Sequence, residues 1–215
     1  MRESIDFLKD TSHLPVSAYH ALPYHPLLSL DRIGWWYEKL ADEASKPLWM
    51  YTSANWARFI PPEFVKTMKE HQNIGGVKYS TSNAVHMERV SALADDDFQV
   101  MAAVVRTLFT SLSLGVKAIT SVEACPFIKP IMSIYDKFSK GDFKGALADQ
   151  RSLNTLLEMM PKEPGNDNFL RVAEGKYILS KKGICGEGMS GYYRTLTTEE
   201  KLKIDHITAQ FSEFI

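Results

Sequence analysis

Short apolar stretches alternate with amphipathic stretches along the first 125 residues, and this alternation limits the folds open to the chain. The apolar stretches predict five strands, at residues 14–22, 47–52, 73–79, 97–103 and 116–122. Between them, apolar residues recur every three or four positions, which predicts helices at 31–45, 61–71, 83–94 and 104–114. Strands and helices that alternate at this spacing are typical of parallel strands joined by right-handed crossovers. We therefore expect an α/β fold.

Residues that favour helix ends support these boundaries. Asp31 and Asn83 are typical N-terminal caps, and Pro61 and Pro62 suit a first helical turn. Gly115 is a typical C-terminal glycine. After residue 122 no strand is predicted, and helices are expected near 126–139, 142–160, 168–182 and 197–213. The chain is thus predicted to end in a helical region.

The composition excludes several classes of protein. With 215 residues, 45% of them hydrophobic, the chain can bury one sizeable core, in one domain or at most two. The formal net charge is -1, and no run of Lys and Arg suggests a nucleic-acid or membrane surface. Cys125 and Cys185 lie far apart without metal-ligand spacing, which favours a reducing compartment. Because no apolar signal region or membrane-length apolar run is present, we expect a cytoplasmic protein.

Lys78 stands where the strand predicted at 73–79 gives way to small polar residues. Active sites of parallel α/β proteins lie at the carboxyl ends of strands, so this lysine is a candidate site residue. Most lysines at strand ends simply reach water or a carboxylate, and this is the simpler interpretation. In an apolar pocket, however, loss of hydration would lower the pKa of the lysine and favour its neutral amine. A neutral amine can attack a ketone to form a Schiff base.

Tyr51 lies near the end of the strand predicted at 47–52, and Lys78 near the end of the next one. The phenol and the amine could therefore meet at the same rim, the carboxyl-terminal end of the sheet. Schiff-base chemistry needs a hydroxyl group that shuttles protons, and Tyr51 could supply it. A packed tyrosine whose hydroxyl bonds to the backbone is the alternative. His25 follows an earlier strand and also points to this rim, although a single histidine there is more often a packing or surface residue.

Two other patterns carry little functional signal. The glycine-rich stretch 183–191 follows a predicted helix rather than a strand, so a connector is a better interpretation than a phosphate-binding loop. The histidines show no spacing with carboxylates that is typical of a metal site.

Several motifs follow one another along the chain at characteristic spacing. They are 22–25 (Leu-Pro-Tyr-His), 50–52 (Met-Tyr-Thr), 75–78 (Gly-Gly-Val-Lys), 114–122 (Leu-Gly-Val-Lys-Ala-Ile-Thr-Ser-Val) and 138–142 (Phe-Ser-Lys-Gly-Asp). In this order they resemble the dihydrodipicolinate synthase / N-acetylneuraminate lyase family of class I, pyruvate-dependent aldolases. The resemblance covers nearly the whole chain.

This resemblance implies a (β/α)8 TIM barrel, here a partial barrel of about the last five βα units plus C-terminal helices. Residues 1–125 would be the C-terminal portion of the barrel. Residues 126–215 would be the last barrel helix and a C-terminal helical region within the same structural unit. The family's first three strands, including the loop that holds the pyruvate carboxylate, have no counterpart, so the N-terminal third is expected to be lacking.

The resemblance also implies roles for individual residues. Lys78 would form the imine with pyruvate or another 2-oxo acid, and Tyr51 would relay protons. Ser80 and Thr120 would line the substrate pocket with His25, which stands where the family has a second tyrosine. No cofactor and no metal are implied, and membership would imply a homo-oligomer.

Other observations leave alternatives open. Arg58 is displaced from the position of the arginine that holds the aldehyde's carboxylate in the synthase branch, so the aldehyde substrate is not identified. The missing strands also allow a catalytically inactive fragment or pseudoenzyme that acts only as an assembly partner. A third possibility is a small-molecule binding domain that uses the same pocket without chemistry.

Overall fold

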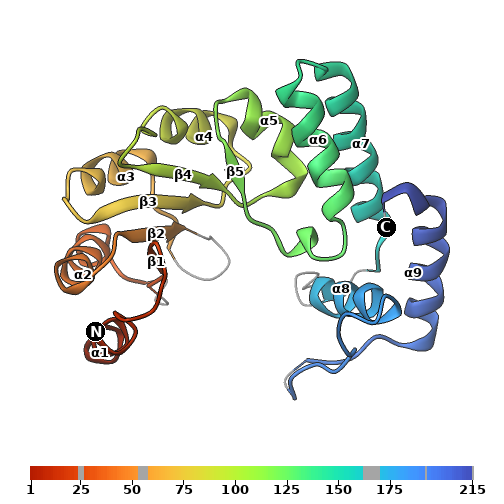
Figure 1. The fold of residues 1–215 in the computed structure, drawn as a ribbon, viewed down its shortest axis with the longest axis horizontal. Helices are drawn as coiled ribbons and strands as arrows, with labels where there is room; N and C mark the ends of the chain where they lie inside the picture. The colour runs from red at the N-terminus through yellow and green to blue at the C-terminus, as the bar shows by residue number, and fades with distance from the viewer. Residues whose placement is uncertain (24–26, 53–57, 162–169, 192, 215) are drawn as a thin grey trace. The chain divides into compact units, whose positions relative to one another are not determined.

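Five parallel strands form one sheet, in which each strand lies next to its neighbours in the chain (Figure 1). They are β1 (Tyr19–Ala21), β2 (Leu48–Thr52), β3 (Ile74–Tyr79), β4 (Gln99–Ala102) and β5 (Ala118–Ile119). The structure is a computed structural model that describes residues 1–23, 27–52, 58–161, 170–191 and 193–214. The parallel pairing confirms the predicted α/β class, since each strand is reached from the last through a helical connection.

The first and last predicted strands are shorter than expected. In the first, the N–H of Val16 donates to the carbonyl of Leu14 at 2.8 Å in a tight turn, so only Tyr19–Ala21 joins the sheet. In the last, the N–H of Val116 donates to Ser111 at the end of a helix, and Ser121 caps the short helix that follows. Local hydrogen bonds thus take the donors that longer strands would need.

The chain divides into two compact units. The N-terminal unit contains residues 1–104 and 110–119, and the C-terminal unit contains residues 105–109 and 120–215. The sheet belongs to the N-terminal unit. Its helices are α1 (Arg2–Asp10), α2 (Leu30–Glu43), α3 (Pro62–Lys69) and α4 (Ala84–Ser91). After β4 come η1 (Val105–Thr107), which belongs to the C-terminal unit, and α5 (Leu108–Ser113), most of which belongs to the N-terminal unit.

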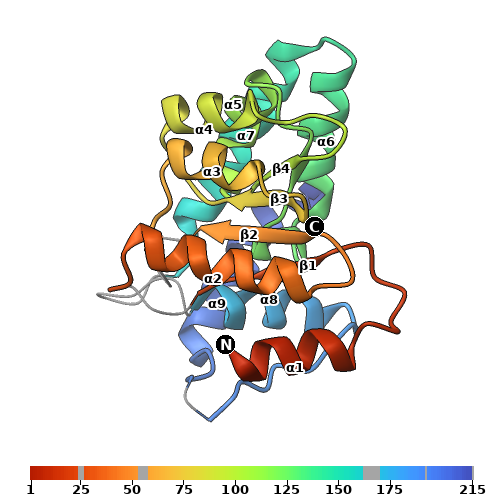
Figure 2. The ribbon, with the colours of Figure 1, turned by 90° about the vertical axis from the view of Figure 1, so that its left-hand side faces the viewer.

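Helices α2, α3 and α4 lie along one face of the sheet (Figures 1 and 2). They bury an apolar stripe against it, and α2 contributes Ile33, Tyr37 and Leu40. Asn83 caps α4 as predicted, by accepting the N–H of His86. The prediction for α2 was wrong by two residues: Ser29 rather than Asp31 is the cap, because its hydroxyl accepts the N–H of Arg32.

Alternation along β2 separates the two faces of the sheet. Leu48, Met50 and Thr52 are fully buried toward the helices, whereas Trp49 and Tyr51 point to the other face and are only partly buried. In β3, a Cβ atom on Gly76 would lie 2.7 Å from the Trp49 ring, which places Gly76 on the same face as Trp49. Lys78 follows two residues later and therefore also lies on this second face.

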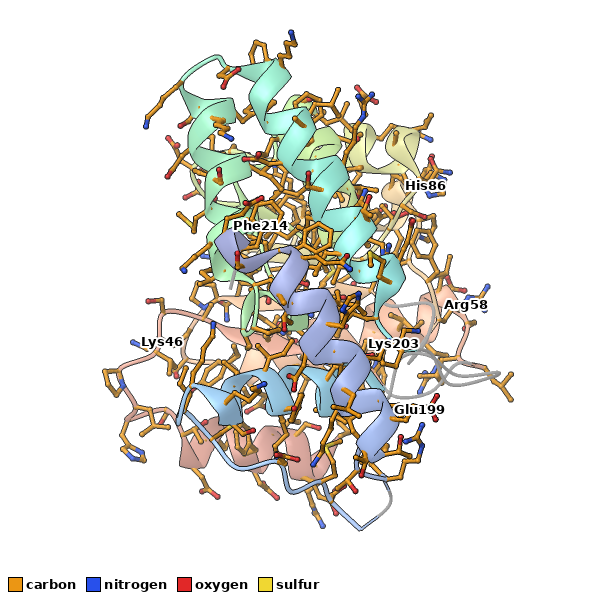
Figure 3. All side chains as sticks on the ribbon, turned by 90° about the vertical axis from the view of Figure 1, so that its right-hand side faces the viewer. Lys46, Arg58, His86, Glu199, Lys203 and Phe214 are labelled. Atoms are coloured by element: carbon orange, nitrogen blue, oxygen red, sulfur yellow. The ribbon has the colours of Figure 1, made fainter. Side chains whose placement is uncertain are left out.

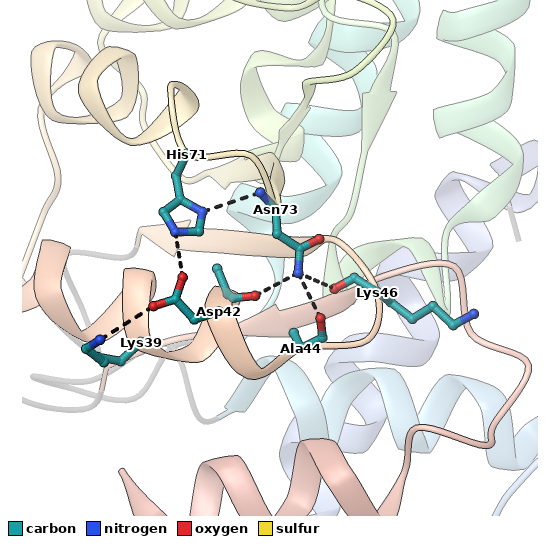
Figure 4. Close-up of polar contacts among 7 residues, drawn as sticks. Lys39, Asp42, Ala44, Lys46, His71 and Asn73 are labelled. Atoms are coloured by element: carbon teal, nitrogen blue, oxygen red, sulfur yellow. Dashed lines mark hydrogen bonds and ion pairs between the residues drawn. The ribbon is translucent and has the colours of Figure 1, made fainter.

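Asn73 ties the start of β3 to the end of α2 (Figure 4). Its side-chain amide donates to the carbonyl oxygens of Ala41 at 2.7 Å, Ala44 at 2.9 Å and Lys46 at 3.4 Å. These carbonyls belong to the last turn of α2 and the loop after it, which lack helical donors. The contact fixes the amino-terminal end of the strands, whereas Lys78 lies near their carboxyl-terminal end.

The C-terminal unit is helical. It contains η2 (Val122–Ala124), α6 (Ile128–Ser139), α7 (Phe143–Met159), α8 (Leu170–Lys181), α9 (Thr198–Gln210) and η3 (Ser212–Phe214). Helices α6 and α7 pack side by side, and Asp149 of α7 accepts hydrogen bonds from Ser133 and Lys137 of α6. Glu199 and Lys203 extend from the exposed face of α9 (Figure 3). Within the described part of the chain, no helix is long and apolar enough to cross a membrane.

Candidate active site

Lys78 and Tyr51 meet at the carboxyl-terminal end of the sheet. They are register partners in the parallel pair β2–β3, and both side chains are partly buried. The Nζ atom of Lys78 lies 4.1 Å from the centroid of the Tyr51 ring. An ammonium group over the face of a phenol ring is attracted to it, so the ring holds the amine above this end of the sheet.

His20 is the third residue of this group, and it was not among the site residues predicted from the sequence. It lies in β1, and its ring centroid is 5.1 Å from that of Tyr51, with an angle of 33° between the planes. Burial lowers the pKa of His20 below its ordinary value, and the positive charge of Lys78 lowers it further. A polar residue between Tyr19 and Ala21 in an otherwise apolar strand was the available signal.

Tyr37 of α2 holds the two strands that carry His20 and Tyr51. Its hydroxyl accepts the N–H of Tyr51 at 3.1 Å and lies 3.1 Å from the carbonyl oxygen of Ala21, to which it can donate. The side chain is fully buried, and burial raises its pKa, so the hydroxyl keeps its proton. The carboxyl ends of β1 and β2 are therefore fixed from the helix side.

A second buried tyrosine fixes the segment that returns after β2. The hydroxyl of Tyr79 donates to the carbonyl of Ile60 at 3.1 Å, and the hydroxyl of Thr52 accepts the N–H of Ile60 at 3.2 Å. Both side chains lie on the helix face, next to Lys78 and Tyr51 in their strands. The residues that directly follow Tyr51 and Lys78 are thus held by buried hydrogen bonds.

The remaining predicted site residues have different positions. Ser80 directly follows β3 and is partly buried in the N-terminal unit, whereas Thr120 belongs to the C-terminal unit. His25 lies outside the described residues. Arg58 donates to the carbonyl of Leu28 at 3.0 Å. The structure therefore brings together Lys78, Tyr51 and a histidine other than the predicted one.

Among the residues that the structure describes, no group of three or more His, Cys, Asp and Glu side chains could hold a metal ion. The chemistry that the described group offers is that of an amine, a phenol and an imidazole on one face of a parallel sheet.

Comparison with known proteins identifies similar sequences. A model of the dihydrodipicolinate synthetase family matches residues 1–210. A 4-hydroxy-tetrahydrodipicolinate synthase from Thermodesulfovibrio yellowstonii is 30% identical over 147 residues, which cover 65% of this chain and 47% of that protein. A 2-dehydro-3-deoxy-D-gluconate/2-dehydro-3-deoxy-phosphogluconate aldolase from Picrophilus torridus is 33% identical over 176 residues, which cover 80% of this chain and 63% of that protein. The chain thus matches less than two thirds of the length of either relative.

Solved structures share the fold. A sialic acid aldolase from Ruminococcus gnavus, solved as a catalytic lysine mutant, superimposes with a TM-score of 0.86 at 16% identity. The match covers 100% of this chain and 72% of that one. At this identity the likeness shows the fold alone, and it confirms the predicted TIM-barrel class: five parallel strands in chain order, followed by helices.

Proposed function

Because the chain belongs to the dihydrodipicolinate synthetase family, we propose that it is a lyase or aldolase that acts through an imine on Lys78. Its substrates would be pyruvate or another 2-oxo acid and an aldehyde, joined or split at the carbon next to the carbonyl group. The observation that carries this proposal is the position of the Lys78 amine, 4.1 Å above the ring of Tyr51 at the carboxyl end of parallel strands. The Ruminococcus gnavus relative, in which a lysine is catalytic, supports the same choice.

The first step is the formation of the imine. The neutral amine of Lys78 adds its electron pair to the carbonyl carbon of the 2-oxo acid, and the carbonyl oxygen becomes the hydroxyl of a carbinolamine. That hydroxyl gains a proton and leaves as water, while the nitrogen lone pair forms the double bond to carbon and the nitrogen becomes positively charged. The positive nitrogen then withdraws electrons from the neighbouring carbon, whose proton can be removed to give an enamine that attacks the aldehyde.

Tyr51 is the group we propose to move these protons. Its phenol can donate to the departing hydroxyl and take the proton back when water later attacks the imine. Its backbone N–H is already held by Tyr37, so the ring position does not depend on the substrate. A positioned acid–base group of this kind accelerates a step about a hundredfold or more.

Intact mass after incubation with pyruvate and borohydride tests the proposal. Reduction of the imine leaves a stable adduct on Lys78, so we expect it on the wild type and not on Lys78→Ala. Lys203→Ala is the matched control, because Lys203 is an exposed lysine in α9 of the other unit. An adduct on Lys78→Ala, or none on a folded wild type, would refute the Schiff-base proposal.

A second candidate function is that of an inactive assembly partner of a full-length family member. A groove of about 510 Å³ runs beside the edge strand β1. Phe7, Leu14 and Val16 line it and expose apolar surface that a partner could cover. Co-expression with a full-length relative tests this, since a chain that never co-purifies with it has no role as its partner.

Self-association would cover the same surface, and we propose that the chain forms a homo-oligomer. Sedimentation tests this, because a stable monomer at all concentrations would refute it.

The cysteines Cys125 and Cys185 are both free and exposed, which supports our proposal of a reducing, cytoplasmic location.

A further inference from the structure

The proposed chemistry uses the amine of Lys78 and the phenol of Tyr51, but it leaves His20 without a role. His20 lies in β1, one strand from Tyr51 and two strands from Lys78, on the same face of the sheet. The Tyr51 ring is thus flanked by a lysine on one neighbouring strand and a histidine on the other. The ring packs against Tyr51 on one side, but the residue as a whole is exposed, so a small molecule above the Tyr51 ring could reach the imidazole.

A 2-oxo acid places a particular demand on this group. Its carboxylate is bonded directly to the carbon that the Lys78 nitrogen attacks, so the negative charge must come to rest close to that nitrogen. Buried or half-buried carboxylates need hydrogen-bond donors, and charged donors are the strongest. Lys78 alone is a poor partner for this carboxylate, because its nitrogen keeps only one N–H in the protonated imine.

We propose that His20 binds the carboxylate of the 2-oxo acid held on Lys78, and that it thereby selects acids over uncharged ketones. This inference rests on the function proposed above and names the residue that recognises the acid group. An imidazole N–H can donate to one carboxylate oxygen while the other ring nitrogen is open to solvent. Tyr51 would then lie below the carbon chain of the substrate, between the imine and the carboxylate.

The charges around His20 fit this role. From β3, Lys78 disfavours the imidazolium form, and burial of the ring acts in the same direction, so the pKa is lowered in the free protein. From β2, the ring contact is with Tyr51, and from α1, Glu3 lines the same groove. An arriving carboxylate supplies the negative charge that offsets Lys78, so its binding would favour protonation of His20 and a charge-assisted hydrogen bond.

The test compares pyruvate with methyl pyruvate, which has the same ketone but no negative charge. The amount of borohydride-trapped adduct on the full chain is measured against ligand concentration for wild type and His20→Phe. The phenylalanine keeps an aromatic ring against Tyr51 but has no nitrogen donor. We expect the half-saturating concentration of pyruvate to rise about tenfold or more, and that of methyl pyruvate to change little.

Two further variants separate recognition from packing. His20→Gln restores an N–H donor and should recover part of the preference for pyruvate. His86→Phe is the control, since His86 lies in α4 and stacks on Phe59, with ring centroids 5.5 Å apart. Its ratio between the two ligands should equal that of the wild type.

The outcomes distinguish the two proposals. If His20→Phe reduces the adduct formed with pyruvate and with methyl pyruvate equally, His20 only packs against its neighbours. This inference is then wrong, while the proposal of an imine on Lys78 is unaffected. An unchanged pyruvate curve leads to the same conclusion. If the wild type forms no adduct with either ligand, the imine proposal itself is refuted, and the role of His20 falls with it.

Discussion

The hydroxyl of Tyr37 in α2 accepts the backbone N–H of Tyr51 in β2, with 3.1 Å between oxygen and nitrogen. The same oxygen lies 3.1 Å from the carbonyl oxygen of Ala21, the residue after His20. A buried helix residue therefore touches the backbone of both strands whose side chains flank the candidate reaction centre. This makes Tyr37 a positioning residue rather than a catalytic one.

Tyr37→Phe tests this relationship. The change leaves the buried N–H of Tyr51 without its acceptor, which should lower the free energy of unfolding by about 1–3 kcal/mol in urea titrations. Because Tyr51 is then held less well, the borohydride-trapped adduct should also form several-fold more slowly at saturating pyruvate. The control is Tyr177→Phe, which removes a hydroxyl that donates to Asp205 in the other unit. An equal loss of adduct rate in both variants would contradict a specific positioning role.

Gly76 leaves room for the strand that follows it and for Trp49. A Cβ atom there would lie 2.7 Å from the carbonyl oxygen of Gln99 and 2.7 Å from the Trp49 ring. Gly76→Ala should therefore force β3 and β4 apart and lower the free energy of unfolding by about 1–3 kcal/mol. Lys78 is two residues away, so adduct formation should fall as well. Gly188→Ala, where no atom lies within 4 Å, should leave the urea midpoint and the adduct unchanged.

Much of the fold could be predicted because the signals are local. The apolar stretch 47–52 predicted β2 (Leu48–Thr52) almost to the residue, and the capping side chain of Asn83 fixed the start of α4. Where two residues offered the same signal, local sequence could not choose between them. Ser29 and Asp31 are both good caps, and only the position of the Ser29 hydroxyl relative to the N–H of Arg32 decides.

The candidate site was likewise predicted only in part from the sequence. Lys78 and Tyr51 end successive strands, so their meeting followed from parallel pairing alone. His20 did not, because its place beside Tyr51 depends on which residues of the first strand pair with β2. The sequence predicted that strand over 14–22, whereas pairing begins at Tyr19 opposite Leu48. Because the strand was predicted too long, the sequence did not show which of its residues lies beside Tyr51.

Asn73 is expected to contribute more stability than its partly exposed position suggests. Its amide donates to the carbonyls of Ala41, Ala44 and Lys46, and Asn73→Ala removes all three bonds at once. We expect a loss of about 1–3 kcal/mol in urea unfolding. Asn73→Asp should be at least as damaging, because a carboxylate would place oxygen against those oxygens. If the aspartate variant matched the wild type, the contacts in Figure 4 would not be stabilising.

Glu200 should make the stability of α9 depend on pH. Its carboxylate accepts two hydrogen bonds from the Arg194 guanidinium and one from the N–H of Thr197, the cap of the helix. The bonds from Arg194, ahead of the backbone contact, lower the pKa of Glu200 from 4.5 to about 2. The lowered pKa means that the folded form favours the charged carboxylate. The resulting stability is present above pH 4.5 and is lost as the pH falls toward 2.

Glu200→Gln measures this contribution, because glutamine keeps the shape and the capping position but not the charge. Since the Arg194 side chain is 41% exposed and solvent screens its charge, we expect the variant to be less stable by about 1 kcal/mol at pH 7. The difference in urea midpoint between wild type and variant should shrink below pH 4.5 and vanish near pH 2. Glu199→Gln alters an exposed neighbour in the same helical turn and should change stability by only a few tenths of a kcal/mol. A difference for Glu200→Gln that stays constant from pH 7 to pH 2 would show that the charge on Glu200 contributes nothing.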